Sequence, residues 1–292
     1  MKYLPMTLAW ALLTFSTGAQ ACELSASTSG GGLQAVYDPF APQNTVVDLR
    51  VSVTNSGDEA CLGRFYIAPL DGQLNMTAGG QYLAYRIEGA NSGALPNEFG
   101  PFNVNVPAGG SEKFSIRFTV QAQQIVPVGL YTGRLTLRGE TAANEPVPVG
   151  GAIPIVTMAV PARSEISISG APSPSLTSIG MAPATINFPN AQTGQTGRVF
   201  INVWANSSVQ VRLTSENGGI MRNLQSPSLT PLSYSATFDG NALSLANVQT
   251  LNRTPPMSIL GASYELAITL GDTTHNFAGR YRDRITVDVD AN

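Results

Sequence analysis

Short runs in which hydrophobic and polar residues alternate follow one another along the chain, and clusters of Gly, Pro, Asn and Ser separate them. This pattern is typical of the strands and turns of a β-sandwich. In the first half it predicts strands at 22–27, 33–37, 46–54, 64–69, 82–88, 112–120, 131–138 and 153–160. In the second half it predicts strands at 164–169, 184–188, 198–205, 209–214, 232–238, 264–270 and 281–290. The stretch 102–106 also alternates and is a candidate to pair with 112–120 across the turn at 107–110.

An internal repeat relates the two halves of the chain. Phe114–Leu137 aligns without a gap on Tyr264–Val287, and both copies contain Gly-x-Tyr-x-x-Arg-[Leu/Ile]-Thr-[Leu/Val]. Looser matches pair Leu83-Ala84-Tyr85 with Leu232-Ser233-Tyr234, Asn55-Ser56 with Asn206-Ser207, and Tyr37-Asp38 with Phe188-Pro189. Self-similarity over this length indicates two copies of one fold. We therefore expect two tandem immunoglobulin-like β-sandwiches, at 22–162 and 163–292.

The pleat of the last strand that both halves share assigns its two faces. The residues expected to face the core are Leu135, Leu137, Ile285, Val287 and Val289. Tyr131 and Tyr281 stand at the start of these strands, where a sandwich often uses a tyrosine hydroxyl to close a corner. We expect a structural role for both tyrosines.

The two halves differ beyond that strand. After Leu137 the chain adds an apolar run at 152–160, whereas no such run comes after Val289. We therefore expect the second sandwich to lack its last strand and to leave an apolar groove beside Tyr281, Ile285, Val287 and Val289. Such an edge is a template for a strand from another chain.

The first residues are typical of a secretory signal. Lys2 precedes an apolar run from Leu8 to Phe15, and Ala19-Gln20-Ala21 follows. We expect removal of residues 1–21 and export of a chain that begins at Cys22. Lipid on Cys22 is an alternative, although a lipoprotein signal favours Leu at the position of Ala19. In an exported chain the two cysteines, Cys22 and Cys61, are expected to form a disulfide, with free thiols as the alternative.

Composition excludes several classes of function. Charged residues are 12% of the chain, and Lys113 is the only lysine after the expected signal, so no basic surface for nucleic acid is expected. The single histidine, His275, cannot build a multi-histidine metal site, and no Gly-x-Ser-x-Gly turn accompanies it. The glycine-containing stretch 190–197 precedes no helix pattern and is expected to be a turn. We expect no enzyme, no metal and no cofactor.

The C-terminal segment resembles a known motif. Ala278-Gly279-Arg280-Tyr281-Arg282-Asp283, followed by alternating Thr and Val, is similar to the closing motif of the spore coat protein U-like domain family. That family includes subunits of archaic chaperone-usher pili. The resemblance implies a fimbrial subunit at the cell surface, with a periplasmic pilus chaperone, an outer-membrane usher and the donor strand of an adjacent pilin subunit as partners.

A two-domain subunit that accepts a strand without donating one resembles a tip adhesin for surface attachment or biofilm formation. The loops at 55–63, 89–111 and 139–152 are expected to lie at the far end of the first sandwich. The apolar residues there that are candidates for contact with an unknown surface or receptor are Leu95, Phe99, Phe102, Val147 and Val149. Their alternative role is an extra strand and a core plug. Alternatives for the whole chain are a shaft or adaptor pilin, or a secreted spore-coat-like or carbohydrate-binding module with a closed sandwich.

Overall fold

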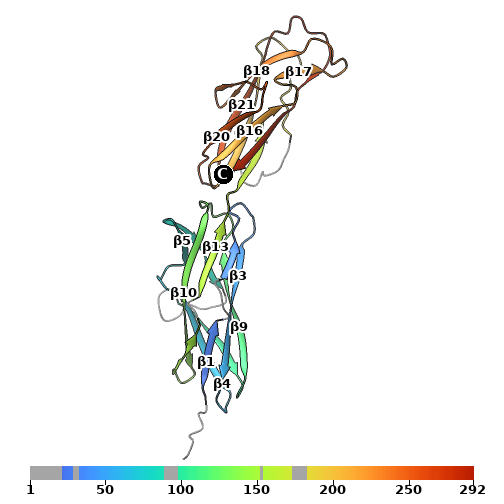
Figure 1. Ribbon diagram of the computed structural model, residues 1–292. Coiled ribbons are helices and arrows are strands. Elements are labelled where there is room, and N and C mark those ends of the chain that lie inside the picture. Colours follow the sequence, from blue (N-terminus) through green and yellow to red (C-terminus); the bar gives the residue numbers. More distant parts are fainter. Residues whose placement is uncertain (1–21, 29–32, 89–97, 152–153, 173–182) are drawn as a thin grey trace, which may run out of the picture.

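The computed structural model describes residues 22–28, 33–88, 98–151, 154–172 and 183–292. All of its regular elements are β-strands. They form two lobes that lie end to end, and no sheet contains strands of both lobes (Figure 1). The all-β expectation of two tandem sandwiches is therefore confirmed, whereas the expected signal at 1–21 lies outside the described residues.

The first sandwich consists of two sheets. One has the order β12-β1-β3-β9-β7 and the other the order β2-β13-β10-β4-β8, with β5, β6 and β11 attached. The strands are β1 (Leu24–Thr28), β2 (Leu33–Val36), β3 (Thr45–Asn55), β4 (Cys61–Pro69), β5 (Asn75–Ala78), β6 (Gln81–Ala84), β7 (Arg86–Glu88), β8 (Phe99–Val106), β9 (Ser111–Val120), β10 (Gly129–Thr141), β11 (Pro146–Val147), β12 (Val149–Gly150) and β13 (Ile155–Val160).

The last strand of the first sandwich completes its core. β13 lies between β10, to which it is antiparallel, and β2, to which it is parallel. Alternate residues of β13, namely Val156, Met158 and Val160, are buried in the core. This sandwich therefore closes with a strand of its own.

The second sandwich also has two sheets, of the orders β14-β15-β21-β18-β17-β22, with β19 attached to β18, and β20-β16-β23. Its core is built around buried residues of β15, β16, β18 and β21. The strands are β14 (Ser164–Ser169), β15 (Thr196–Ala205), β16 (Val209–Ser215), β17 (Ile220–Asn223), β18 (Leu232–Phe238), β19 (Asn241–Leu243), β20 (Gln249–Arg253), β21 (Ala262–Leu270), β22 (Tyr281–Arg282) and β23 (Ile285–Ala291).

A buried asparagine holds the start of each sandwich in the same way. The side-chain oxygen of Asn55 accepts a hydrogen bond from the backbone N–H of Glu23, and that of Asn206 accepts one from Arg163. The side-chain amide of Asn206 donates to Pro161, and both asparagines are buried. A buried amide must be satisfied, so this arrangement ties the segment before the first strand of each sandwich to the end of the strand that pairs with it, β3 in the first and β15 in the second. The weak Asn-Ser match in the sequence thus marks a structural equivalence.

Two expectations about strands are wrong. Residues 102–106 belong to β8, which pairs with β4 rather than with 112–120, because the turn at 107–110 carries the chain from one sheet to the other. Residues 184–188 form no strand. They correspond to β2, whose pairing depends on β13, and the described part of the second half contains no counterpart of β13.

Candidate functional site

One edge of β23 has no strand beside it in the described part of the chain. On its other side β23 pairs with β16 in an antiparallel ladder from Ser215↔Ile285 to Val209↔Ala291. β10, which β23 repeats, is flanked by β4 on the corresponding side and by β13 on the other. In the first sandwich β13 lies beside residues 129–134 of β10, whose counterparts are 279–284, and no strand of the described second half takes that place. The open side therefore runs from 279 along β23.

The backbone of β23 shows which groups point to this open edge. The carbonyl of Arg284 accepts a hydrogen bond from Glu216 N–H at 2.8 Å, and Asn292 N–H donates to the carbonyl of Ser208 at 2.9 Å. Even-numbered residues thus direct their N–H and C=O groups toward β16, and odd-numbered residues direct theirs to the other side. The groups on the open side belong to Ile285, Val287, Val289 and Ala291.

Two hydrogen bonds support this assignment. Ser164 Oγ, from β14, donates to the carbonyl of Val289 at 3.1 Å and so reaches the open side of the strand. In the first sandwich the N–H of Leu135, the counterpart of Ile285, donates to the carbonyl of Pro154 at 3.0 Å. The same backbone group is thus satisfied in the first sandwich by the segment that leads into β13.

The apolar side chains of β23 are only partly covered. Ile285, Val287 and Val289 pack against the second core, yet they stay half-buried and alternate with exposed residues along the strand. Leu135, the counterpart of Ile285, is 0% exposed. Leu137, the counterpart of Val287, is only partly buried, as Val287 is. Between these two pairs the difference in burial is thus confined to Ile285, whose counterpart Leu135 lies beside Pro154, the residue that leads into β13.

Further apolar residues around the second core are also only partly covered. β14 contributes two of them, and the segment that replaces β2 contributes two more. These residues are Ile166, Ile168, Ile186 and Phe188. Because β2 contacts β13 in the first sandwich, the segment 184–188 is expected to border the same open edge. The site is thus an apolar strip along whose open side the backbone of β23 pairs with no strand of the described residues, although the carbonyl of Val289 accepts a bond from Ser164.

Asp283 anchors the break between β22 and β23. Its carboxylate accepts hydrogen bonds from Ser215 Oγ at 2.6 Å, from Tyr234 OH at 2.5 Å and from the N–H of Asn217 at 3.1 Å. Burial and the bond to Asp283 raise the pKa of Tyr234 above its ordinary value. The sequence motif contains this aspartate, but nothing in the local pattern indicated partners this far along the chain.

Tyr131 and Tyr281, which occupy the same position in the two copies of the repeat, differ in the hydrogen bonding of their hydroxyl groups. Tyr131 OH donates to the carbonyl of Pro127 at 3.0 Å, so the predicted corner closure is confirmed at this position. Tyr281 OH is buried and has no hydrogen-bond partner in the described part of the chain. The corner role is therefore wrong for Tyr281, whose hydroxyl lies at the beginning of the open strand.

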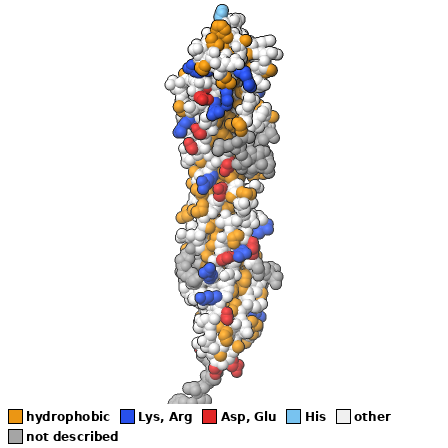
Figure 2. Space-filling model, turned by 90° about the vertical axis from the view of Figure 1, so that its right-hand side faces the viewer, with side chains coloured by type: hydrophobic (Ala, Val, Ile, Leu, Met, Phe, Trp, Pro, Cys, Tyr) orange, Lys and Arg blue, Asp and Glu red, His pale blue; other side chains and the backbone are white. Residues whose placement is uncertain are grey.

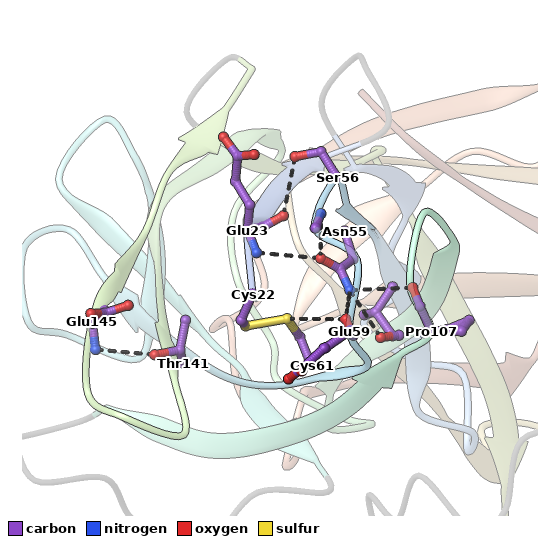
Figure 3. The surroundings of a disulfide bond; sticks show 11 residues. Cys22, Glu23, Asn55, Ser56, Glu59, Cys61, Pro107, Thr141 and Glu145 are labelled. Carbon is purple, nitrogen blue, oxygen red and sulfur yellow. Dashed lines mark hydrogen bonds between the residues drawn. A yellow bond between two sulfur atoms is a disulfide. The ribbon is translucent and has the colours of Figure 1, made fainter. Parts of the chain in front are cut away.

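The predicted disulfide is present. Cys22, just before β1, is bonded to Cys61 at the start of β4, with 5.6 Å between the Cα atoms. Figure 3 shows the side chain of Asn55 beside this bond, in contact with Glu23, Glu59 and Pro107. The bond joins the two sheets at the end of the first lobe remote from the second (Figure 1).

Three of the five candidate adhesive residues do not form exposed apolar tips. Val147 is 5% exposed and belongs to the first core. Phe99 and Phe102 are half-buried against that core, because β8 pairs with β4 and the Phe102 ring stacks on that of Phe114. Val149 is exposed, and Leu95 lies outside the described residues.

Other chemistry is sparse in the described residues. They contain no group of three or more potential metal ligands, and none of their elements is a helix long and apolar enough to cross a membrane. A shallow hollow of about 290 Å³ on the first sandwich is lined in part by Asp48 and Arg117, which form an ion pair at 3.0 Å. The open strand edge is thus the feature that most needs a functional explanation.

No family model matches the chain, and no curated protein matches its sequence. A chain of the CsuC–CsuE chaperone–tip adhesion subunit complex, from the archaic chaperone-usher Csu pili of Acinetobacter baumannii, is 15% identical with a TM-score of 0.46, and the match covers 92% of this chain and 100% of that one. CfaE, the adhesive subunit of the CFA/I fimbria of enterotoxigenic Escherichia coli, is 12% identical with a TM-score of 0.32, over 92% of this chain and 81% of that one. Self-complemented MyfA, the major subunit of Myf fimbriae from Yersinia enterocolitica, is 11% identical with a TM-score of 0.29, over 48% and 98%. Similarity this distant leaves the function to be inferred from the open edge itself.

Proposed function

We propose that this protein is a subunit of a chaperone-usher pilus whose second sandwich accepts a donor strand from an adjacent subunit. Its partners during assembly are a periplasmic chaperone and an outer-membrane usher, and its destination is the cell surface. We further propose that it occupies the tip of the fibre, where the first sandwich mediates attachment. The proposal assigns the protein no catalytic role.

The observation that carries the proposal is the contrast between two copies of one strand. β10 has β13 beside its first half, at 129–134, whereas no strand of the described residues lies on that side of the second copy, at 279–291, where β23 presents half-buried apolar side chains. An unpaired edge of this kind favours addition of a strand from another chain, with alternate side chains entering the core. A closed carbohydrate-binding or coat module would have no need of such an edge.

The tip position is supported by the first sandwich. This sandwich contains its own last strand and a disulfide, so it does not depend on a partner for completion. A chain with one complete and one open sandwich can devote the complete one to binding.

Complementation tests the acceptor role. The chain without its signal is produced alone and with a strand of the β13 sequence joined after Asn292 by a short flexible linker. The fused strand is expected to raise the melting temperature of the second sandwich by more than about 10 °C and to suppress aggregation, because it covers apolar surface. An unfused chain that is a stable monomer with the same melting temperature would contradict the acceptor role.

Immunogold labelling tests the tip position separately. Antibodies against the first sandwich are expected to label only the ends of purified fibres. Labelling along the fibre would instead identify a shaft or adaptor subunit and would leave the acceptor role intact.

A further inference from the structure

Charged residues are ordered along the open strand. Arg280, Arg282 and Arg284 lie just before β23, with Arg282 in β22, and Asp288 and Asp290 lie near the end of β23. All five are exposed and alternate with the half-buried residues that face the core. Among the described residues none of them has an ion-pair partner within 4.0 Å.

The basic end is reinforced by a neighbouring strand. Arg222 of β17 lies directly opposite Arg282 of β22, and both side chains are exposed. Like charges in opposite positions destabilise a strand pair, so this arrangement does not serve the stability of the second sandwich alone. On the face drawn in Figure 2, basic side chains gather in the upper part of this lobe.

The first sandwich does not share this order. The counterparts of Arg280 and Arg282 are Leu130 and Thr132, which are uncharged. Near the other end of β10, Arg138 is paired with Glu140 at 2.8 Å and with Glu98 at 3.2 Å. The charge order therefore occurs on the strand whose edge is open and not on the strand that β13 already covers.

The spacing allows the two ends to act separately. Arg282 and Asp290 are eight positions apart in sequence, which corresponds to at most about 27 Å in an extended chain. Charges are screened over about 8 Å at physiological ionic strength. Each end therefore interacts mainly with the part of an added strand that lies beside it, through cross-strand pairs on the solvent face.

The direction of the added strand follows from β13. β13 is antiparallel to β10, with Val160 opposite Gly129, so its C-terminal end lies at the beginning of β10. β13 itself lies beside 129–134, the counterparts of 279–284. A longer strand added in the same direction starts beside Asp290, near the C-terminus that Figure 1 marks at the junction of the lobes, and ends beside Arg280.

We propose that the open edge selects its partner by charge order, an inference that rests on the acceptor role proposed above. The partner is an extended segment of another polypeptide with apolar residues at alternate positions. Its solvent-facing positions are basic in the N-terminal half, beside Asp288 and Asp290, and acidic in the C-terminal half, beside Arg280, Arg282 and Arg284. The order of charges thus contributes both register and specificity.

Three fusions of the full chain without its signal test this inference. Each carries a strand after Asn292 with the same apolar positions. The solvent-facing positions are uncharged in the first fusion. In the second they are basic in the N-terminal half and acidic in the C-terminal half, and in the third this order is reversed. The second and third strands have the same composition. The basic-then-acidic strand is expected to melt at least about 5 °C above the reversed one in low salt, and 1 M NaCl is expected to abolish most of the difference.

The outcomes separate the two proposals. Equal melting temperatures for the ordered and reversed strands, or a higher value for the reversed one, would overturn the charge order while the uncharged strand still reports the acceptor role. Failure of the uncharged strand to stabilise the chain would overturn the acceptor role itself. A stable dimer of the unfused chain that persists when the ordered strand is fused would assign the edge to a second copy and overturn the proposal.

Charge reversal provides a matched control. The double substitution Arg282→Glu and Arg284→Glu is expected to invert the preference between the two charged strands. Arg134→Glu changes the counterpart of Arg284 on the covered strand β10 and is expected to leave the preference unchanged. The three side chains are exposed, so the variants are expected to fold. An unaltered preference in the double variant would contradict the inference.

Discussion

Tyr85 and Tyr234 occupy corresponding positions in the repeat, but only one of their hydroxyl groups has a partner. Tyr234 OH donates to Asp283, whereas Tyr85 OH is buried and lacks a hydrogen bond in the described part of the chain. The position that corresponds to Asp283 is Gly133, which has no side chain to accept the bond. The difference between Gly133 and Asp283 thus explains why only Tyr234 has a hydrogen-bond partner.

Phenylalanine substitutions should therefore have opposite effects. Tyr234→Phe removes a hydrogen bond to a carboxylate and is expected to lower the free energy of unfolding of the second sandwich by about 1–2 kcal/mol. Tyr85→Phe removes an unsatisfied buried hydroxyl and is expected to leave the first sandwich unchanged or more stable by about 0.5–1 kcal/mol. Urea denaturation of the two variants measures both values. Equal destabilisation would contradict the difference in hydrogen bonding.

Tyr85 also predicts sensitivity to alkali. Burial, with a smaller contribution from Asp71, raises its pKa in the folded chain. In the unfolded chain a tyrosine ionises near pH 10, so the stability from this group is fully present below that pH and is lost as the pH rises toward the folded-state value. The expected loss is about 1.4 kcal/mol per pH unit above pH 10. Unfolding measured between pH 9 and 11 should show a smaller slope for Tyr85→Phe than for the unchanged chain.

Val147 and Val149 are two residues apart but differ in burial, so substitutions at the two positions distinguish a role in stability from a role in surface contact. Val147 is packed in the first core, whereas Val149 is 36% exposed. Val147→Ser is expected to destabilise the first sandwich by about 1–3 kcal/mol, and Val149→Ser should change its stability by less than about 0.5 kcal/mol. Loss of adhesion with Val149→Ser, at unchanged melting temperature, would identify a contact residue. Val147→Ser cannot be used for that purpose, because it changes the core.

At the scale of single elements, β23 offers a direct test of strand addition. Val287 faces the open groove, and its neighbour Thr286 faces solvent. A lysine at Val287 can extend its charge into water while the groove is open, but an added strand would bury it. Val287→Lys is therefore expected to reduce the stabilisation given by a fused strand by more than about 3 kcal/mol, whereas Thr286→Lys should reduce it little. Melting temperatures with and without the fused strand give the comparison.

The repeat explains why the open edge could be predicted from sequence. The strict alternation in Leu135–Leu137 and Ile285–Val289 assigns the core face of both strands, and the apolar run at 152–160 predicted the strand β13 beside the first copy. Periodicity does not identify neighbours, however. It revealed the alternation of β8 but not its pairing with β4, because the pleat reports faces and not partners.

Other features depend on contacts far along the chain. The partners of Asp283 at Ser215 and Tyr234 are 68 and 49 residues away, so no local pattern reveals them. The short strands β5, β17 and β19 were missed because they are only three or four residues long. Tyr281 was predicted to repeat the corner of Tyr131, but it lacks a hydrogen-bond partner among the described residues.

At the scale of the whole molecule, the disulfide should stabilise one sandwich only. Cys22 and Cys61 are 39 residues apart and both belong to the first sandwich, and the sequence has no other cysteine. Replacing both cysteines with serine is expected to lower the stability of the first sandwich by about 4 kcal/mol on the chain-entropy model. Calorimetry should show two transitions, of which only one shifts. A shift of both would mean that the sandwiches unfold together.

The placement of β13 also determines how the molecule would carry a mechanical load. Residues 161–163 join the end of β13 directly to β14, so tension between the two lobes pulls β13 along its own length. Its backbone bonds to β10 and β2 lie across that direction and resist together rather than one after another. A strand seated beside β23 in the same antiparallel manner would be held in shear as well, so the junction with the polypeptide that supplies it could transmit force without a covalent link.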